Sequence, residues 1–516
     1  MRCLVWLFCC LPLLSWSQYT SFLVGNQFNP NEPAIIIDAF NPDHLVAGSN
    51  IDKYYYSDDG GETWSFGTLS SSYGVWGDPC IVEDTNGYFY FFHLSNPPGG
   101  NWIDRIVCQK STDGGLTWSD GSYMGLNGTK AQDKEWAAVD PVSNNIYVTW
   151  TQFDKYGSTD PADSSIIRFS RSVDGGISWS PAIRINKIAG DCRDMDNTVE
   201  GALPAVGPNG EIYISWAGPE GLLFTKSLDQ GITWPSENIF VSDLPGGWDF
   251  AIPGISRANG FPVTCCDRSG GPYRGRIYIN WSDQRNGIED TDIWLVYSDD
   301  GGSTWSDRIR VNDDPPGKQQ FFNWMSIDQT TGYLYIVFYD RRNCTDSWTE
   351  VYLAVSRDGG STWDNFLIDE SSFNPVSSIF FGDYNNISVQ NGIVRPIWTR
   401  MDNMALSLWT AEIDSLYIGI APGKQVPNFL SLEQNYPNPV QGVTYFSYKI
   451  HAPTTVSLKI YDCYGKVVAT IVDEKFHNPG SYIEQIDIGS HQLSNGFYFF
   501  SLISSEQTLR RKMIVE

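Results

Sequence analysis

An eight-residue pattern that occurs six times constrains this chain more than any other feature. The copies, such as SDDGGETW and STDGGLTW, begin at Ser57, Ser111, Ser172, Ser227, Ser298 and Ser356 and end in Trp. In each copy the Asp can accept backbone N–H groups inside a turn, Gly supplies positive φ, and the Trp can pack beneath the turn. The starts lie 54 to 71 residues apart. One hairpin-containing unit is therefore repeated along the chain.

A second recurring segment lies upstream of the later turns and is typical of a β-strand. Each copy follows a Gly or Asn turn and alternates aromatic with β-branched residues. The copies are NGYFYFFHLS from Asn86, NNIYVTWTQFD from Asn144, GEIYISWAGPE from Gly210, GRIYINWSDQR from Gly275, GYLYIVFYDRR from Gly332 and GIVRPIWTRMD from Gly392. With an opening unit that contains PAIIIDAF, they give seven units of about 55 residues between residues 31 and 420.

These units predict an all-β fold in which four-stranded blades surround a central channel, as in a β-propeller. We favour seven blades; six are the alternative, because terminal strands often combine to close a propeller. The S-x-D-x-G-x-T-W pattern resembles the Asp-box (BNR) repeat of sialidase-like β-propellers, and sialidases have six blades. The resemblance implies that each box joins the third and fourth strands of a blade, on the face away from the active site.

The character of the chain changes after residues 421–428 (APGKQVPN), which we interpret as a linker. Short alternating strands then predict a small β-sandwich over residues 429–516. This region resembles the C-terminal sorting domain of type IX secretion cargo at NYPNP (435–439), at Tyr461, Asp462 and Gly465, at NGFY (495–498) and at RKMI (511–514). The resemblance implies export through the periplasm by the type IX machinery. A generic carbohydrate-binding or immunoglobulin-like module is the alternative.

The N-terminus reads as a secretory signal over residues 1–17, followed by the propeller over 18–420. Its apolar run is too short to span a bilayer, so we expect no transmembrane segment. The net charge is −26 and the pI about 4.5, which disfavours nucleic acid as a partner. We therefore expect a protein that is secreted or held on the outer cell surface.

Seven cysteines follow the signal, an odd number whose spacings match no zinc site. Disulfides are compatible with export, but the sequence leaves their pairing open. The adjacent Cys265 and Cys266 fit a pair of small strand residues better than a redox site.

Propeller topology predicts where polar side chains gather. The residues that lead into each innermost strand, and those that follow each second strand, should emerge opposite the Asp boxes and converge on one central basin, the usual form of a ligand site. The lead-in residues are Glu32, Asp78, Glu135, Glu200, Asn259, Asn323, Asp383 and Tyr384. The residues after the second strands are Asp52, Asp154, Asp283, Arg285, Asp340, Arg341, Arg342, Arg400 and Asp402, with Trp76, Trp136, Trp248 and Trp324 nearby. Such a set suits a sugar, although it could equally form ion pairs between blades.

The resemblance to sialidases implies roles for some of these residues. That family uses three arginines to bind the substrate carboxylate, an Asp as acid/base, and a Tyr–Glu pair as nucleophile. Our candidate catalytic residues are accordingly Tyr384, Glu200, Asp52 and Asp78, since a neighbouring base can activate a phenol. Our candidate substrate-binding residues are Arg285, Arg341, Arg342, Arg400, Glu135, Asp283, Asp340, Trp136 and Trp324.

The first arginine of that family's triad has no counterpart. Where the family has an Arg-Ile-Pro-type motif this chain has NEPA at residues 31–34, and no Arg lies between Gln18 and Arg105. Glu32 would repel the carboxylate of sialic acid, which argues against a true sialidase.

We therefore expect a propeller that acts on an extracellular glycan or glycoprotein as a hydrolase or lyase. The alternative is a non-catalytic module that binds glycan or protein, because Asp boxes specify fold and not activity; a structural surface-layer role is a third hypothesis. We expect no cofactor and no catalytic metal. Two acidic loops could hold structural Ca²⁺: Asp191, Asp194, Asp196 and Asn197, and Glu289, Asp290 and Asp292.

Overall fold

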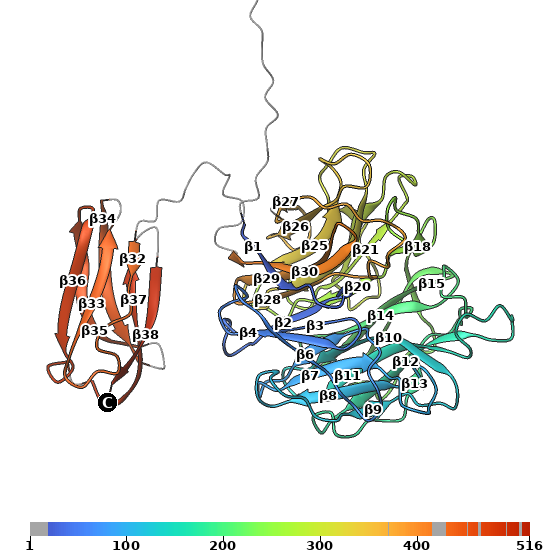
Figure 1. Ribbon diagram of the computed structural model, residues 1–516, viewed down its shortest axis with the longest axis horizontal. Coiled ribbons are helices and arrows are strands. Elements are labelled where there is room, and N and C mark those ends of the chain that lie inside the picture. The colour runs from blue at the N-terminus through green and yellow to red at the C-terminus, as the bar shows by residue number, and fades with distance from the viewer. Residues whose placement is uncertain are drawn as a thin grey trace, which may run out of the picture. The chain divides into compact units, whose positions relative to one another are not determined.

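The computed structural model describes residues 19–369, 371–414, 430–450, 453–462, 466–491, 493–504 and 508–515. Within these ranges the protein is built from β-strands and loops without helices, as expected (Figure 1). It divides into two compact units, residues 1–419 and 420–516. The expected signal (1–17) and linker (421–428) lie outside the described residues.

Seven antiparallel sheets of four or five strands make up the described part of the first unit. The first three are β2 (Ala34–Ile37), β3 (Leu45–Ser49), β4 (Lys53–Ser57) and β5 (Ser65–Thr68); β6 (Cys80–Glu83), β7 (Phe89–Leu94), β8 (Ile106–Ser111) and β9 (Ser122–Met124); β10 (Ala131–Val139), β11 (Ile146–Phe153), β12 (Ser165–Ser172) and β13 (Ile183–Arg184). The next three are β14 (Glu200–Val206), β15 (Ile212–Gly218), β16 (Gly221–Ser227) and β17 (Ile239–Ser242); β20 (Val263–Cys266), β21 (Ile277–Asp283), β22 (Asp292–Ser298) and β23 (Ile309–Arg310); β24 (Gln320–Ile327), β25 (Leu334–Asp340), β26 (Glu350–Ser356) and β27 (Asp364–Leu367). A short hairpin, β18 (Asp249–Phe250) and β19 (Ala258–Asn259), is inserted between the fourth and fifth sheets.

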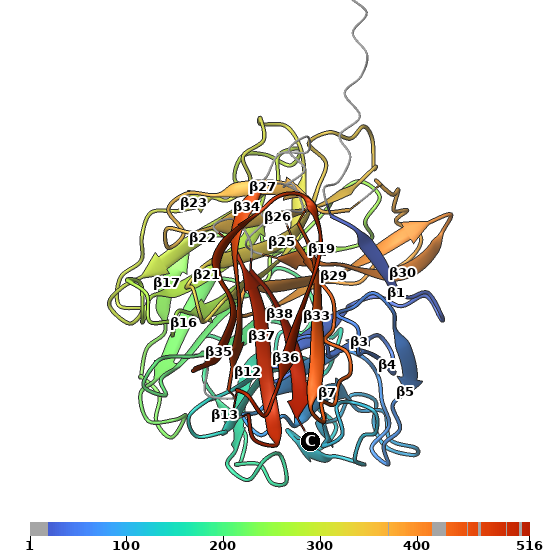
Figure 2. The same cartoon turned by 90° about the vertical axis from the view of Figure 1, so that its left-hand side faces the viewer.

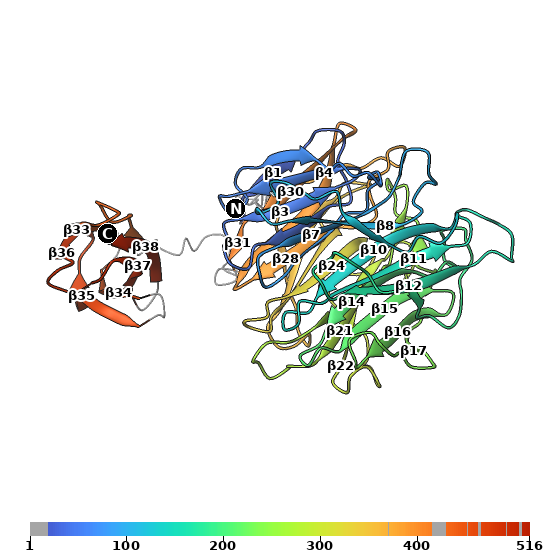
Figure 3. The ribbon, with the colours of Figure 1, turned by 90° about the horizontal axis from the view of Figure 1, so that it is seen from below.

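The seventh sheet joins the two ends of the unit. It consists of β28 (Asn386–Gln390), β29 (Ile393–Asp402), β30 (Ala405–Ala411) and β31 (Ile413–Asp414), with β1 (Ser21–Gly25) as its outer strand. Ser21 pairs with Ala411 and Phe22 with Thr410, so the blue β1 lies beside the orange β30 (Figure 3). The terminal strands thus combine within this last sheet.

The first strands of the seven sheets form a closed ring. Each contacts the first strand of the next sheet, and β28 contacts β2. They enclose a cavity of about 680 Å³ to which all seven strands contribute residues. The arrangement is that of a β-propeller, and the central channel runs between first strands.

Each Asp box connects the third and fourth strands of its sheet. In the box after β22, Thr304 N donates to Asp300 Oδ1 (2.9 Å) and Gly302 N donates to Ser298 Oγ (2.8 Å). The Cβ of any other residue at Gly302 (φ +81°) would come within 2.2 Å of Phe224 in the preceding sheet. Trp305 packs on the same Phe224, with ring centroids 5.1 Å apart. The box therefore closes a turn and also wedges neighbouring sheets together.

The described part of the second unit is a sandwich of two antiparallel sheets (Figure 2). Its strands are β32 (Leu430–Leu432), β33 (Val443–Ile450) and β36 (Gly480–Asp487) in one sheet, and β35 (Val467–His477), β34 (Thr454–Tyr461), β37 (Gly496–Ile503) and β38 (Thr508–Val515) in the other. Phe446 and Phe500 meet edge to face between the sheets at 4.6 Å, in a core of alternating inward residues.

The six described cysteines that follow the signal, Cys80, Cys108, Cys192, Cys265, Cys266 and Cys344, are free thiols, and Cys463 lies outside the described residues. Cys265 and Cys266 lie on β20, as small strand residues. In the described ranges, no helix has the length and hydrophobicity needed to cross a bilayer.

Candidate functional site

The chain enters most of the first strands through the same backbone kink. A residue with positive φ stands two positions before the strand residue that faces the channel: Glu32 (50°), Asp78 (54°), Lys134 (53°), Gly201 (76°) and Phe322 (53°). Non-glycine residues adopt this conformation rarely. In β10, β14 and β24 the pairing register also shifts at this point, as in a β-bulge, which re-aims side chains at the end of a strand.

The kinks bring lead-in residues of different sheets into contact, and we call the resulting group the axial cluster. Its members are Glu32, Asp78, Asp133, Lys134, Glu135, Asp194, Glu200, Arg257, Asp383 and Tyr384. The buried Lys134 Nζ lies 3.4 Å from Glu32 and 3.2 Å from Asp78, which lead into the first and second sheets. It lies 3.0 Å from Asp383, which leads into the seventh. The predicted convergence therefore holds for these lead-in residues.

Arg257 is the second cation of the axial cluster and comes from the inserted hairpin. It pairs with Asp383 and, at 2.6 Å, with Asp194. Asn259 Nδ2 donates to the backbone oxygen of Asp383 at 2.7 Å. Burial alone would raise the pKa of Asp383, but Arg257 and Lys134 hold that pKa well below its ordinary value. Asp383 is therefore an ionised carboxylate.

Tyr384 lies at the base of the cluster. Its hydroxyl is 3.5 Å from Asp78 Oδ1, and Lys134 Nζ is 5.8 Å from its ring centre. Burial and the charges of Asp78 and Glu32 raise the pKa of Tyr384 well above its ordinary value, so the phenol is protonated. The expected partner of Tyr384 was Glu200; the carboxylate hydrogen-bonded to it is Asp78.

Glu135 and Glu200 stand out because their carboxyl oxygens have no hydrogen-bond partner among the described residues. Their exposed fractions are 1% and 0%. Burial, and then the charges of Asp78 for Glu135 and of Asp194 for Glu200, raise the pKa of both well above the ordinary value. Burial thus favours the protonated form of both side chains.

The axial cluster contains seven carboxyl groups and two cations. Even with Glu135 and Glu200 neutral, five carboxyls remain against Lys134 and Arg257. Burial raises the pKa of Glu32 and Asp133 as well, which reduces the net charge without reversing its sign. An anionic ligand would be repelled from this site, whereas a neutral or cationic ligand would not.

None of the four predicted arginines is a member of the axial cluster, and three of them pair with carboxylates two residues away. Arg285 pairs with Asp283 and lies over Trp294 of the third strand, with the guanidinium 5.0 Å from the ring centre. Arg342 Nη2 lies 2.8 Å from Asp340 and donates to Asn365 of the fourth strand. Arg400 pairs with Asp369 at 3.0 Å and Asp402 at 2.6 Å.

The expectation that these residues converge with the lead-in residues is thus corrected. The second strand is one strand farther from the axis than the first, and each of these guanidiniums finds a carboxylate two residues away in its own sheet. Asp283 and Asp340 are held in the same pairs. Asp52 likewise pairs with its neighbour Lys53 at 2.5 Å, and it has no hydrogen bond or ion pair to the axial cluster within the described chain.

Arg341 differs from the other three arginines. It is buried, its Nε donates to Thr349 Oγ1 at 3.1 Å, and its guanidinium lies 5.1 Å from the ring centre of Phe321. The two terminal nitrogens have no hydrogen-bond partner among the described residues. Burial without a carboxylate lowers the pKa of Arg341 to about 10.

The two predicted tryptophans form the floor beneath the axial cluster. Trp136 and Trp324 are buried, with ring centres 5.8 Å and 5.9 Å from that of Tyr384. They also line the central cavity, so they lie between the cluster and the channel. In this position they support Tyr384 and do not offer an open face to a ligand.

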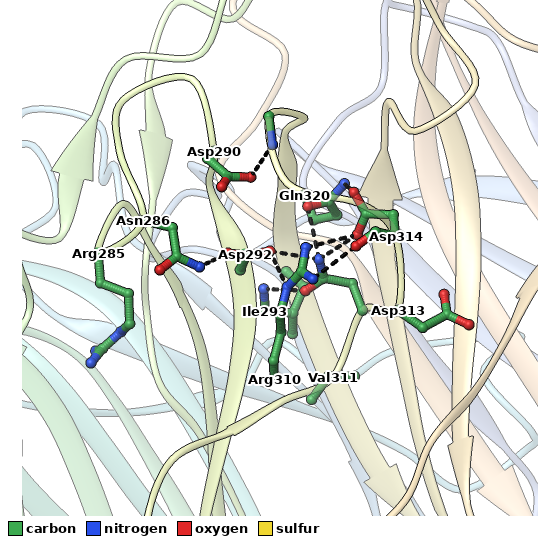
Figure 4. Close-up of polar contacts among 12 residues, drawn as sticks. Arg285, Asn286, Asp290, Asp292, Ile293, Arg310, Val311, Asp313, Asp314 and Gln320 are labelled. Carbon is green, nitrogen blue, oxygen red and sulfur yellow. Dashed lines mark hydrogen bonds and ion pairs between the residues drawn. The ribbon is translucent and has the colours of Figure 1, made fainter.

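A second dense group of polar side chains, the Asp292 network, lies between the fifth and sixth sheets (Figure 4). Its members are Asn286, Asp292, Arg310, Asn312, Asp314 and Gln320. Asp292 accepts from Arg310 Nε (2.6 Å) and Asn312 Nδ2 (2.7 Å), and Asp314 accepts from Asn312 (2.7 Å). In Figure 4 the side chain of Arg285 points away from this network.

Residues of the two acidic loops form ion pairs or hydrogen bonds with other parts of the protein. Asp194 bonds to Arg257, Asp196 accepts from Asp249 N, and Asp290 accepts from Gly317 N. Across the described residues no group of three or more His, Cys, Asp or Glu is placed to hold a metal ion. Structural Ca²⁺ stays a prediction.

Sequence reasoning missed four members of the axial cluster: Asp133, Lys134, Asp194 and Arg257. Asp133 and Lys134 directly precede Glu135 in the stretch AQDKEW, so taking three residues instead of one at each lead-in would have found them. No signal in the sequence marked Arg257, which lies on the inserted hairpin.

Two parts of the chain match the models of known families. The model of the secretion system C-terminal sorting domain matches residues 434–516, and that of the BNR/Asp-box repeat matches residues 55–66. The chain thus carries an Asp-box repeat and a C-terminal sorting domain. That domain indicates that the protein engages the type IX secretion machinery and is secreted or held at the cell surface. No curated protein matches the chain.

Several solved structures are distantly similar. They include NanB sialidase from Streptococcus pneumoniae (9% identity, 76% of this chain and 94% of that chain, TM-score 0.43). An α-L-arabinofuranosidase from Fusarium graminearum has 14% identity over 66% of this chain and 98% of that chain, with a TM-score of 0.43. A polysaccharide lyase, an ulvan lyase, has 12% identity over 77% of this chain and 96% of that chain, with a TM-score of 0.45.

Proposed function

We propose that the propeller is a glycan-active enzyme of the hydrolase or lyase type whose site is the axial cluster. The observation that carries this proposal is the pair of buried carboxylic acids, Glu135 and Glu200, which have no hydrogen-bond partner in the described part of the chain. A buried polar group without a partner lowers the stability of the folded state by about 1–3 kcal/mol. Two such groups beside one cluster are typical of a catalytic site and unusual in a structural one.

The cluster offers the groups that cleavage of a glycosidic bond requires. A carboxylic acid that stays protonated near neutral pH can donate a proton to the leaving oxygen. The raised pKa of Glu135 and of Glu200 suits them to this role. Asp78, next to the Tyr384 hydroxyl, could accept the phenol proton as Tyr384 attacks a sugar carbon or removes a ring proton. Lys134 would hold Asp78 in place during either step.

The charge of the cluster restricts the glycan. With Glu135 and Glu200 protonated, five carboxyls still face two cations, so a sialic acid or uronic acid carboxylate would be repelled here. Neutral sugars and amino sugars would not. We therefore propose a neutral or amino-sugar glycan as the substrate. This substrate class favours a hydrolase, because a lyase removes a ring proton that is acidic only beside the carboxylate of a uronic acid.

A depolymerisation screen tests the proposal. Purified protein would be incubated with neutral, amino-sugar and acidic polysaccharides, and reducing ends and unsaturated sugars would be measured. We expect release from a neutral or amino-sugar polymer, which Glu200→Gln and Tyr384→Phe abolish. Release that both variants leave intact would refute the site, and release from acidic polymers alone would refute the substrate class.

One observation favours the alternative of a non-catalytic binding module. Lys134 and Arg257 hold Glu32, Asp78 and Asp383 in ion pairs that link four sheets and the inserted hairpin. Such pairs also suit a scaffold. Glycan binding without any release of sugar in the same screen would support this second candidate.

A further inference from the structure

Two exposed tryptophans lie next to the axial cluster on the face opposite the Asp boxes. Trp76 is 39% and Trp102 43% exposed. Their ring centres are 6.4 Å apart and the rings are nearly perpendicular, at 88°. Trp102 also meets Tyr156 edge to face at 5.3 Å. Exposed aromatic groups of this size are uncommon on a monomer surface unless they bind something.

This group is continuous with the axial cluster by two routes. Along the backbone, Trp76 is followed by Gly77 and then by Asp78, whose N–H donates to Asn50 Oδ1 at 2.8 Å. Through side chains, Tyr156 Oη donates to Asp194 Oδ2 at 2.6 Å, and Asp194 pairs with Arg257. A chain bound at the cluster could therefore extend over the tryptophans.

The backbone holds both tryptophans in place. Trp76 N donates to Leu94 O (2.9 Å), and Leu94 N donates to Gly77 O (3.0 Å). Gly77 has φ +97°, and a Cβ there would come within 2.0 Å of Asn50. Next to Trp102, Ile103 N donates to Ser95 O (2.9 Å). Side chains fixed before binding lose little conformational entropy when a ligand stacks on them.

We infer that Trp76, Trp102 and Tyr156 form an aromatic subsite, the Trp76–Trp102 platform, for a neutral or amino sugar of a glycan chain. The negative face of an indole ring attracts the polarised C–H groups of a pyranose and, more strongly, an ammonium group. The exposed Asn96 and Asn101 could bond sugar hydroxyls at its edge. This inference rests on the proposed function in that both place a glycan on this face.

The test measures binding separately from turnover. Glu200→Gln protein would be titrated calorimetrically with hexasaccharides of N-acetylglucosamine, glucosamine, glucose and galacturonic acid. Trp76→Ala and Trp102→Ala would be added singly to this background. Trp348→Ala is the matched control, because Trp348 is also 43% exposed but lies in the loop between β25 and β26 of the sixth sheet. Thermal unfolding would show that each variant is folded.

We expect at least one neutral or amino hexasaccharide to bind, with Kd raised about 10-fold or more by each platform substitution and less than about 2-fold by Trp348→Ala. Binding that both platform variants retain, or binding to none of the sugars, would overturn the platform. A dimer that Trp102→Ala dissociates would also overturn it, because the patch would then bind a second copy. If binding depends on the platform but the screen detects no depolymerisation, the aromatic subsite is supported and the proposed enzymatic activity is refuted.

Discussion

The axial cluster and the Asp292 network are both buried and both rich in carboxylates, yet they differ in how those carboxylates are bonded. In the Asp292 network, Asp292 and Asp314 each accept several charge-assisted hydrogen bonds (Figure 4). In the axial cluster, Glu135 and Glu200 accept none within the described residues. Burial alone therefore does not separate these two regions, whereas the hydrogen bonding of their carboxyls does.

The largest expected effect is on activity. Glu135→Gln and Glu200→Gln should each lower kcat/KM by about 10²–10⁴-fold, because an amide cannot donate the proton. Measured near pH 4, where the carboxyl is protonated in the folded and the unfolded chain alike, the free energy of unfolding should change by less than about 1 kcal/mol, since neither carboxyl has a bond to lose. Initial rates on the glycan found in the screen, with urea unfolding of the same samples, would check both expectations. A large loss of stability would show that the cluster is structural.

The reverse pattern is expected for the Asp292 network. Asp292→Ala should destabilise the propeller by about 3 kcal/mol, because Arg310 and Asn312 would lose their acceptor in a buried setting. Its activity per folded molecule should stay near that of the wild type. Urea unfolding followed by tryptophan fluorescence measures the loss of stability. An assay of the folded fraction measures the activity per folded molecule. If Asp292→Ala folds as stably as the wild type, the contrast between the two regions is wrong.

The pH dependence of stability should separate the two regions further. A carboxyl with a raised pKa keeps its proton in the folded state after the unfolded chain has released it. Glu135 and Glu200 therefore make the free energy of unfolding fall as pH rises above about 4.5, by at most about 1.4 kcal/mol per pH unit for each group.

The double variant Glu135→Gln/Glu200→Gln should lack this slope. Urea unfolding between pH 5 and pH 8 should show it gaining stability relative to the wild type as pH rises. Glu83, whose pKa burial raises to about 8, contributes a slope of the same sign in both proteins. Parallel curves for the two proteins would contradict the assignment of Glu135 and Glu200 as neutral acids.

The smallest effect is expected at a surface ion pair. Arg276 Nε lies 2.7 Å from Asp299, whose side chain is 59% exposed. Asp299→Asn should change the free energy of unfolding by less than about 0.5 kcal/mol, because water screens the pair. The same urea experiment measures it. A loss as large as that of Asp292→Ala would mean that ion pairs stabilise this propeller regardless of burial.

The sequence predicted the fold more completely than the site. The six Asp boxes and the recurring strand segments predict antiparallel sheets that surround a channel, and the all-β propeller is confirmed. The pairing of β1 with β30 was not predicted, because no feature of residues 21–25 indicates that they pair with a strand almost 400 residues later.

Within the site, the lead-in rule located Glu32, Asp78, Asp383 and Tyr384 correctly at the axis. The separate expectation for the residues after the second strands failed for Arg285, Arg342 and Arg400, because a long side chain binds whichever carboxylate it can reach. Trp136 and Trp324 were located at the axis too, but their burial could not be read from the sequence. The exposed pair proved to be Trp76 and Trp102.

By itself the sequence determined the repeated turn, the sheets that the turn generates and the sorting domain, because each is encoded within segments of eight to about eighty residues. Only the tertiary structure decided which side chains meet at the axis. Lys134 pairs with Glu32 across 102 residues, Arg257 with Asp383 across 126 and Tyr384 with Asp78 across 306. Those contacts depend on where the ring places each lead-in residue, and local sequence does not fix that position.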